Sequence, residues 1–294
     1  MIQYPYNVNS YSLDLPPLGQ GACFIGERAE TAEIEKAALI RGLSHGMNLV
    51  DTAEAYGGGG SERLIGDLFR RRRIRRQDVA IMTKVRPENS APPALSASCD
   101  GSLARLGTDY IDIYLLHWRT ESVSLAGAVY GMEELVRRGK ILRWGVSNFD
   151  VADMDELFRQ SCGSNCAVDQ VLYNLSSRGI EYDLLPWLHG HNVAPVAYCP
   201  LAQGGRLARM GYDFAADAAL AAIAGKYGAT AFQVALAFVL RGGGICAIPK
   251  AANAAHVDEN AAAPALARAI SAADWAALDA AFPPPSSKMH LDMD

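Results

Sequence analysis

Residues 47–60 read MNLVDTAEAYGGGG, and residues 61–69 continue as SERLIGDLF. The apolar run ends at Asp51, a glycine-rich turn follows Tyr56, and Ser61 is placed to cap an amphipathic helix. This order of strand, polar loop and helix predicts one β/α unit. Because a rigid scaffold holds the loop after such a strand, Asp51 and Tyr56 are the first candidate functional residues.

Apolar segments recur along the chain at intervals close to one strand plus one helix. Several are continuously apolar, as parallel strands covered on both faces are. Eight such strand–helix units predict a closed (β/α)₈ barrel, an α/β fold whose site lies at the carboxyl ends of the strands. The apolar segments end near Gly21, Asp51, Lys84, His117, Ser147, Gln170, Tyr198 and Lys250.

Helical patterns fill the intervals between these segments. We expect caps at Thr31, Ser124 and Asp150, and a helix that stops at Gly107. The long interval before the last strand holds two helices within 215–240, and a further helix covers roughly 271–282. Residues 1–17 predict an N-terminal β-hairpin. The expected architecture is one barrel domain spanning 1–294, with this hairpin and two extra helices.

The composition of the 294 residues narrows the possible functions. The length suits either two ordinary domains or one barrel of about 250 residues. The net charge of −5 argues against a nucleic-acid partner, and the apolar run 229–240 is shorter than the ~20 residues of a membrane span. The start has no secretory signal pattern, and the six cysteines form no Cys-x-x-Cys motif. We therefore expect a cytoplasmic protein, without a nucleic-acid or membrane partner.

Four ionisable residues fall at or just after neighbouring strand ends: Asp51, Tyr56, Lys84 and His117. A phenol is a poor proton donor near neutrality, since its ordinary pKa is about 10. A lysine ammonium beside it favours the phenolate, and a carboxylate keeps that lysine charged. A histidine can orient a carbonyl oxygen. The set fits protonation of an oxygen that gains negative charge as a hydride reaches carbon, so a cofactor must supply the hydride.

Five motifs in the same order resemble the aldo-keto reductase family. They are DTAxxYG from Asp51, TK at 83–84, LLHW at 115–118, GVSN at 145–148 and IPK at 248–250. By this resemblance Tyr56 is the general acid, Lys84 and Asp51 tune it, and His117 orients the carbonyl. The resemblance also implies a cofactor site formed by Gly21, Ala22, Cys23, Asp51, Ser147, Asn148, Gln170, Tyr198, Cys199, Pro200, Leu201, Gln203, Ile248, Pro249, Lys250, Ala251, His256, Glu259 and Asn260.

Within that set, the resemblance implies that Ser147, Asn148 and Gln170 hold the nicotinamide amide and that Tyr198 stacks on its ring. The resemblance further implies that Lys250 acts as a point charge on the adenosine 2′-phosphate, which favours NADPH. The sequence departs from the family pattern at Ala251, where a hydroxyl residue is usual, and at His256, where an arginine is usual. Histidine cannot fork onto phosphate, so NADH is the weaker alternative cofactor.

The substrate is expected to be a small carbonyl compound. Residues 179–187 and 254–257, with the LLHW motif, resemble the bacterial methylglyoxal-reducing branch of the family. The loop after Trp118 is short, which leaves an open pocket suited to small aldehydes and 2-oxoaldehydes. Phe24, Tyr56, His117 and Trp118 are the expected pocket residues, in a monomeric enzyme.

Other functions fit parts of the sequence. A lyase that forms a Schiff base on Lys84 or Lys250 would leave Tyr56 unused, and a regulatory subunit would bind cofactor without turnover. The arginines of 70–76 have the composition of a nucleic-acid patch, but they also suit a solvated helix end. No carboxylate or cysteine accompanies the two histidines of 189–191, so no metal site is expected.

Overall fold

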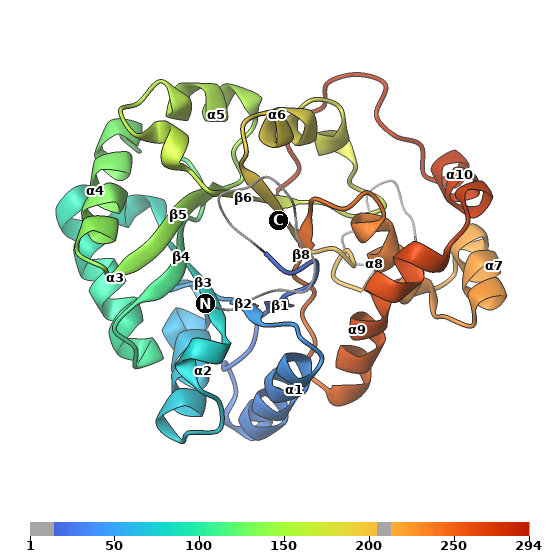
Figure 1. The fold of residues 1–294 in the computed structure, drawn as a ribbon, viewed down its shortest axis with the longest axis horizontal. Helices are drawn as coiled ribbons and strands as arrows, with labels where there is room; N and C mark the ends of the chain where they lie inside the picture. Colours follow the sequence, from blue (N-terminus) through green and yellow to red (C-terminus); the bar gives the residue numbers. More distant parts are fainter. Residues whose placement is uncertain (1–14, 205–212, 294) are drawn as a thin grey trace.

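The computed structural model describes residues 15–204 and 213–293, and Figure 1 shows helices arranged around a ring of strands. Most of the predicted N-terminal hairpin lies outside the described residues. The eight strands pair in parallel and in chain order. Parallel bridges Leu18–Ala247 and Gly21–Lys250 join the first strand segment to the last. The (β/α)₈ barrel predicted from the spacing of apolar runs is confirmed.

The strands are β1 (Gln20–Gly21), β2 (Leu49–Asp51), β3 (Ala80–Val85), β4 (Ile111–Leu116), β5 (Ile141–Ser147), β6 (Val168–Leu172), β7 (Ala194–Tyr198) and β8 (Cys246–Ala247). The predicted ends differ from the observed ones by up to three residues. Lys84 and Gln170 lie inside β3 and β6, whereas His117 follows the end of β4. Strand β8 stops before Pro249, which has no N–H for the ladder, so Lys250 extends beyond it.

The helices are α1 (Ala32–Ser44), α2 (Gly60–Arg70), α3 (Pro92–Leu106), α4 (Leu125–Arg137), α5 (Val151–Phe158), α6 (Leu184–Gly190), α7 (Ala218–Tyr227), α8 (Ala231–Leu240), α9 (Ala254–Ala269) and α10 (Ala272–Ala281). Both α7 and α8 lie between β7 and β8, and α10 follows the barrel, which confirms the two extra helices. Over residues 15–204 and 213–293, no single helix is long and apolar enough to cross a membrane.

The core has two layers because successive strand side chains point to opposite faces. Leu49, Met82 and Val168 pack inside the barrel. Ile81 and Tyr114 belong to the layer between the strands and the helices. Covering both faces buries every residue of β3, which explains why its sequence is not a simple alternation.

Two helix caps formed as predicted and two did not. The Ser124 side chain accepts from the Gly127 N–H, and Asp150 forms a capping box at the start of α5. The Thr31 hydroxyl instead donates to Glu35, so it caps nothing. Ser61 lies inside α2, whose N-cap is a glycine with φ of 81°. Thr31 and Ser61 were wrong as caps because other groups take their hydroxyls: Glu35, four residues further along the chain, for Thr31, and the distant Ala22 carbonyl for Ser61.

Gly107 closes α3 in the left-handed conformation, with φ of 67°, as the sequence predicted. Its backbone N–H donates to the Leu103 carbonyl. The end of this helix therefore follows from a local property of glycine.

Candidate active site

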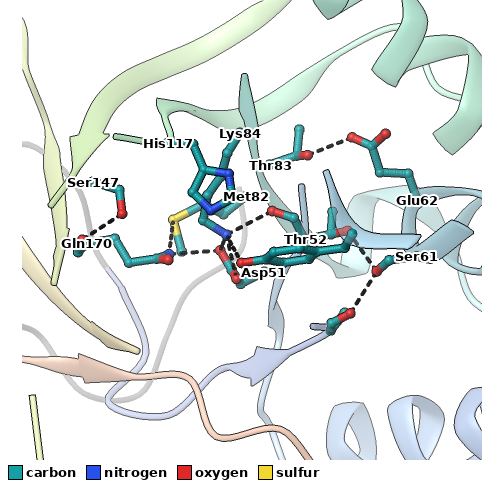
Figure 2. A network of polar contacts seen from close by, with 12 residues as sticks. Asp51, Thr52, Ser61, Glu62, Met82, Thr83, Lys84, His117, Ser147 and Gln170 are labelled. Atoms are coloured by element: carbon teal, nitrogen blue, oxygen red, sulfur yellow. Dashed lines mark hydrogen bonds and ion pairs between the residues drawn. The ribbon is translucent and has the colours of Figure 1, made fainter. Parts of the chain in front are cut away.

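The predicted ionisable residues meet at the carboxyl ends of β2, β3 and β4. Lys84 is completely buried, and its Nζ lies 2.8 Å from the Asp51 carboxylate, 2.9 Å from the Thr52 carbonyl oxygen and 3.0 Å from the Tyr56 hydroxyl oxygen. Figure 2 shows Lys84, Asp51 and Thr52 converging from neighbouring strands. Three acceptors match the three N–H groups of an ammonium, so we assign Lys84 as charged.

Burial controls the electrostatics of this group. It lowers the pKa of Lys84 and raises the pKa of Asp51, and their mutual attraction opposes both shifts. Burial also raises the pKa of Tyr56 well above its ordinary value, and the Asp51 charge raises it further. Burial therefore sets the net direction of the shift in the pKa of this phenol. The expectation that the neighbouring Lys84 ammonium favours the phenolate stays a prediction. The phenol is protonated near neutral pH, which is the form a proton donor needs.

His117 stands beside this phenol. Its ring centroid lies 5.7 Å from that of Tyr56, in an edge-on arrangement, and 4.8 Å from that of Trp118. Burial, with the charges of Lys84 and Arg86, lowers the pKa of His117 to about 3, so the ring is neutral. Its Nδ1 is buried without a hydrogen-bond partner among the described residues. We assign the single N–H to Nε2, because a buried unpaired N–H is costly.

The start of α2 holds Asp51 in place through a contact that sequence reasoning missed. Thr52 donates from Oγ1 to the Ser61 Oγ over 2.8 Å, and Ser61 donates to the Ala22 carbonyl over 3.0 Å. Because Ala22 also donates its N–H to the Asp51 carbonyl, Ser61 ties the ends of β1 and β2 together. The sequence predicted Ser61 to be a helix cap. Its role in joining the ends of β1 and β2 becomes visible only in the structure, where Ser61 is buried.

Glu62, the next residue of α2, joins the start of this helix to β3. It is completely buried, accepts from the Thr83 hydroxyl over 2.6 Å, and pairs with Arg105 over 2.5 Å. Thr83 directly precedes Lys84, and Figure 2 shows Thr83 pointing toward Glu62. A charged residue in the first turn of an amphipathic helix gave no signal of burial, so this residue was not predicted.

The residues expected to hold a carboxamide also lie together. Ser147 donates to the Gln170 carbonyl over 2.8 Å, and Asn148 donates to the Ser147 Oγ over 3.2 Å. The Tyr198 hydroxyl donates to the Asn148 Oδ1 over 2.8 Å, which fixes the tyrosine ring. Gln170 donates from Nε2 to the Asp51 Oδ1 over 2.8 Å. This hydrogen bond joins the residues expected to hold the carboxamide to the cluster of ionisable residues.

The segment after β7 has an unusual backbone. Cys199, Ala202 and Gln203 have φ values of 46°, 47° and 50°, which side chains other than glycine rarely adopt. Such conformations persist where the surrounding structure enforces them, and they are concentrated at ligand sites. The segment follows Tyr198, as expected for a loop that contacts a dinucleotide.

Lys250 and the first turn of α9 follow β8, and they form the next part of the expected cofactor site. Lys250 is exposed and has no ion-pair partner within the described ranges. His256 is also exposed in the first turn of α9. Lys250 lies three residues before Asn253, the N-cap of α9, and an exposed ammonium near a helix N-terminus fits a phosphate group. The other expected cofactor residues lie at the ends of β1, β7 and β8 or on α9: Gly21, Ala22, Cys23, Pro200, Leu201, Ile248, Pro249, Ala251, Glu259 and Asn260.

Two alternative sites gain no support. In the run 70–76, Arg71, Arg73, Arg75 and Arg76 pair with acidic side chains, so most of its charge is compensated. His191 stacks on the indole ring of a neighbouring tryptophan at 3.9 Å between centroids. In the described part of the chain, no group of three or more His, Cys, Asp and Glu side chains is arranged to hold a metal ion.

Comparison with known proteins gives consistent matches over nearly the whole chain. The model of the Aldo/keto reductase family matches residues 17–282. Methylglyoxal reductase YeaE of Escherichia coli strain K12 is 45% identical over 293 residues, which cover 100% of this chain and 98% of that protein. A crystal structure of an aldo/keto reductase from Klebsiella pneumoniae in complex with NADP and acetate has a TM-score of 0.90 and 46% identity, with 96% of each chain covered.

More distant matches carry related names. Methylglyoxal reductase DkgA of Escherichia coli strain K12 is 29% identical over 248 residues, with 84% of this chain and 82% of that protein covered.

Proposed function

This chain belongs to the aldo/keto reductase family, and from that premise we propose that it reduces small aldehydes and 2-oxoaldehydes to alcohols with NADPH. Methylglyoxal represents this substrate class, since the 45% identical relative is named for its reduction. One observation carries the proposal: Lys84 Nζ contacts both the Asp51 carboxylate and the Tyr56 hydroxyl oxygen in a buried site.

Tyr56 is the proposed proton donor. When bound, NADPH supplies a hydride to the carbonyl carbon, and the carbonyl oxygen then gains negative charge. Lys84 donates to the Tyr56 oxygen, so it does not compete for the phenol proton, which is available to the substrate oxygen. Lys84 also stabilises the phenolate that remains, at a separation of 3.0 Å.

His117 orients the substrate carbonyl. Because the pKa of His117 is about 3, the ring is neutral throughout the physiological range and donates one N–H to the carbonyl oxygen. A neutral donor polarises the carbonyl without competing with Tyr56 to deliver the proton.

Residues at the ends of β5, β6 and β7 would hold the nicotinamide. Ser147, Asn148 and Gln170 would bind its carboxamide, and Tyr198 would stack on its ring, in keeping with their mutual hydrogen bonds. Lys250, with an exposed ammonium, would contact the 2′-phosphate that distinguishes NADPH from NADH. The remaining cofactor residues named from the family resemblance would line the same cofactor site.

The proposed pocket is open. Phe24 is 58% exposed, and the ring centroid of Trp118 lies 4.8 Å from that of His117. A short loop separates Trp118 from α4, so few side chains enclose a large substrate. This openness supports small reactive carbonyl compounds as substrates. We also propose a single-domain monomer in the cytoplasm, acting without nucleic-acid or membrane partners.

A substrate panel tests the proposal. Purified protein is mixed with NADPH or NADH and with aldehydes, 2-oxoaldehydes and ketones, and loss of the reduced nicotinamide absorbance is followed. We expect the highest kcat/KM with NADPH and a 2-oxoaldehyde. Tight cofactor binding without turnover of any carbonyl would instead indicate a regulatory subunit.

Borohydride trapping of the substrate on lysine would indicate a Schiff-base lyase. The structure disfavours Lys84 in that role, because a charged and fully hydrogen-bonded ammonium has no free electron pair to attack a carbonyl.

A further inference from the structure

Gln170 lies between the residues expected to bind the carboxamide and the ionisable cluster that contains Asp51. It lies on β6, is 2% exposed, and donates from Nε2 to the Asp51 Oδ1 over 2.8 Å. The Lys84 Nζ lies 2.8 Å from each of the two carboxylate oxygens of Asp51. Figure 2 shows Gln170 and Lys84 reaching Asp51 from different strands. Asp51 is therefore held by two donors, of which only Lys84 also contacts the phenol of Tyr56.

The Asp51 carboxylate fixes which way the Gln170 amide points. An ionised carboxylate only accepts hydrogen bonds, so the amide nitrogen must face it, and the reverse orientation would bring two oxygens together. The Met82 sulfur, 3.8 Å from Nε2, is compatible with the same orientation. Gln170 is thus left with its Oε1 as the atom that a ligand N–H can contact.

We propose that Gln170 is a positioning residue for the proton donor, linking the carboxamide site to Tyr56 through Asp51 and Lys84. The inference rests on the proposed function and adds a role to a residue otherwise expected only to bind the cofactor. One chain of hydrogen bonds runs from the Gln170 amide through Asp51 and Lys84 to the Tyr56 oxygen. The side chain that would accept from the carboxamide therefore also sets the position of Asp51.

The direction of the effect follows from charge. The negative charge of Asp51 raises the pKa of Tyr56, after burial has raised it more. The Gln170 N–H partly compensates that charge. Loss of this donor exposes Tyr56 to more of the Asp51 charge and frees the carboxylate to move. The phenol becomes a weaker and less well placed acid.

Gln170→Met tests the inference, because it removes the amide and keeps the chain length. Ser147→Ala is the matched control, since Ser147 belongs to the same carboxamide group and makes no hydrogen bond to Asp51 among the described residues. The dissociation constant of NADPH is measured by fluorescence, and kcat is measured at saturating NADPH and aldehyde in H₂O and in D₂O.

We expect both variants to bind NADPH more weakly. The saturated kcat should fall by at least about tenfold more in Gln170→Met than in Ser147→Ala, since only the former loses a hydrogen bond to the charged Asp51. Its solvent isotope effect should also exceed that of the wild-type protein, because proton transfer becomes slower. Equal saturated kcat values for the two variants, with unchanged isotope effects, would reduce Gln170 to a cofactor ligand and overturn the inference.

Gln170→Glu gives an independent test if the methionine variant does not fold. Its carboxyl group can donate to Asp51 only when protonated. We expect its kcat to rise toward acidic pH relative to that of the wild-type protein, and a parallel pH profile would contradict the positioning role. An inactive wild-type protein would overturn the proposed function itself, which distinguishes the two failures.

Discussion

Glu62 accepts a hydrogen bond of 2.6 Å from the hydroxyl of Thr83, the residue directly before the buried Lys84. The contact fixes the start of α2 against β3 at the point where the strand delivers its ammonium group. The position of Lys84 therefore depends on a buried carboxylate outside the proposed set of catalytic residues.

Replacing Glu62 should destabilise the protein. Glu62→Ala leaves the Thr83 hydroxyl and the Arg105 guanidinium without their partner, and breaking a buried ion pair costs about 3 kcal/mol. Because Arg105 is 26% exposed, solvent recovers part of this, and we expect a loss of about 2 kcal/mol in the free energy of unfolding. Urea denaturation measures it. The control Glu134→Gln, in an exposed helix pair, should leave stability unchanged.

Tyr56→Phe should remove the proton donor and leave the fold intact. General acid catalysis contributes about a hundredfold or more, so kcat should fall at least that far. The dissociation constant of NADPH, measured by fluorescence titration, should stay close to that of the wild-type protein. Near-normal turnover in this variant would show that another group delivers the proton.

Asp169 predicts an unusual dependence of stability on pH. Both of its carboxylate oxygens are buried without hydrogen-bond partners within the described residues. Burial raises the pKa of Asp169 well above its ordinary value. The nearby Phe149 backbone N–H opposes this rise, and the charges of Asp153 and Asp150 add to it. From about pH 4 up to this raised value, the folded state keeps a proton that the unfolded state releases, so stability falls as pH rises.

Asp169→Asn should remove that dependence. The amide is neutral at every pH, so the variant should be more stable than the wild-type protein at pH 7. Its unfolding free energy should also change less between about pH 5 and pH 8. Thermal unfolding over a series of buffers measures both quantities, and a variant less stable than the wild-type protein at pH 7 would contradict the assignment of a neutral carboxyl group.

His256→Arg should strengthen the preference for NADPH. The histidine is exposed in the first turn of α9, and the N-terminus of a helix favours anions. A guanidinium there can form two hydrogen bonds with a phosphate. We expect roughly tenfold tighter NADPH binding and little change for NADH. An equal effect on the two cofactors would show that residue 256 does not contact the 2′-phosphate.

The sequence by itself determined the barrel and the location of its site. Continuously apolar runs at near-regular spacing require parallel strands covered by helices, and those strands place Asp51, Lys84 and His117 at one end. The end of α3 at Gly107 and the cap at Asp150 were predictable because glycine geometry and carboxylate capping act within a few residues.

Tertiary structure decided the properties that depend on burial and on distant partners. The sign of the Tyr56 pKa shift depends on desolvation, which no local motif reveals. The hydroxyl of Ser61 could cap a helix or join two strands, and only the packed barrel brings Ala22 and Thr52 close enough to decide. Gln170 reaches Asp51 across 119 positions of the sequence, so that contact exists only once the barrel has closed.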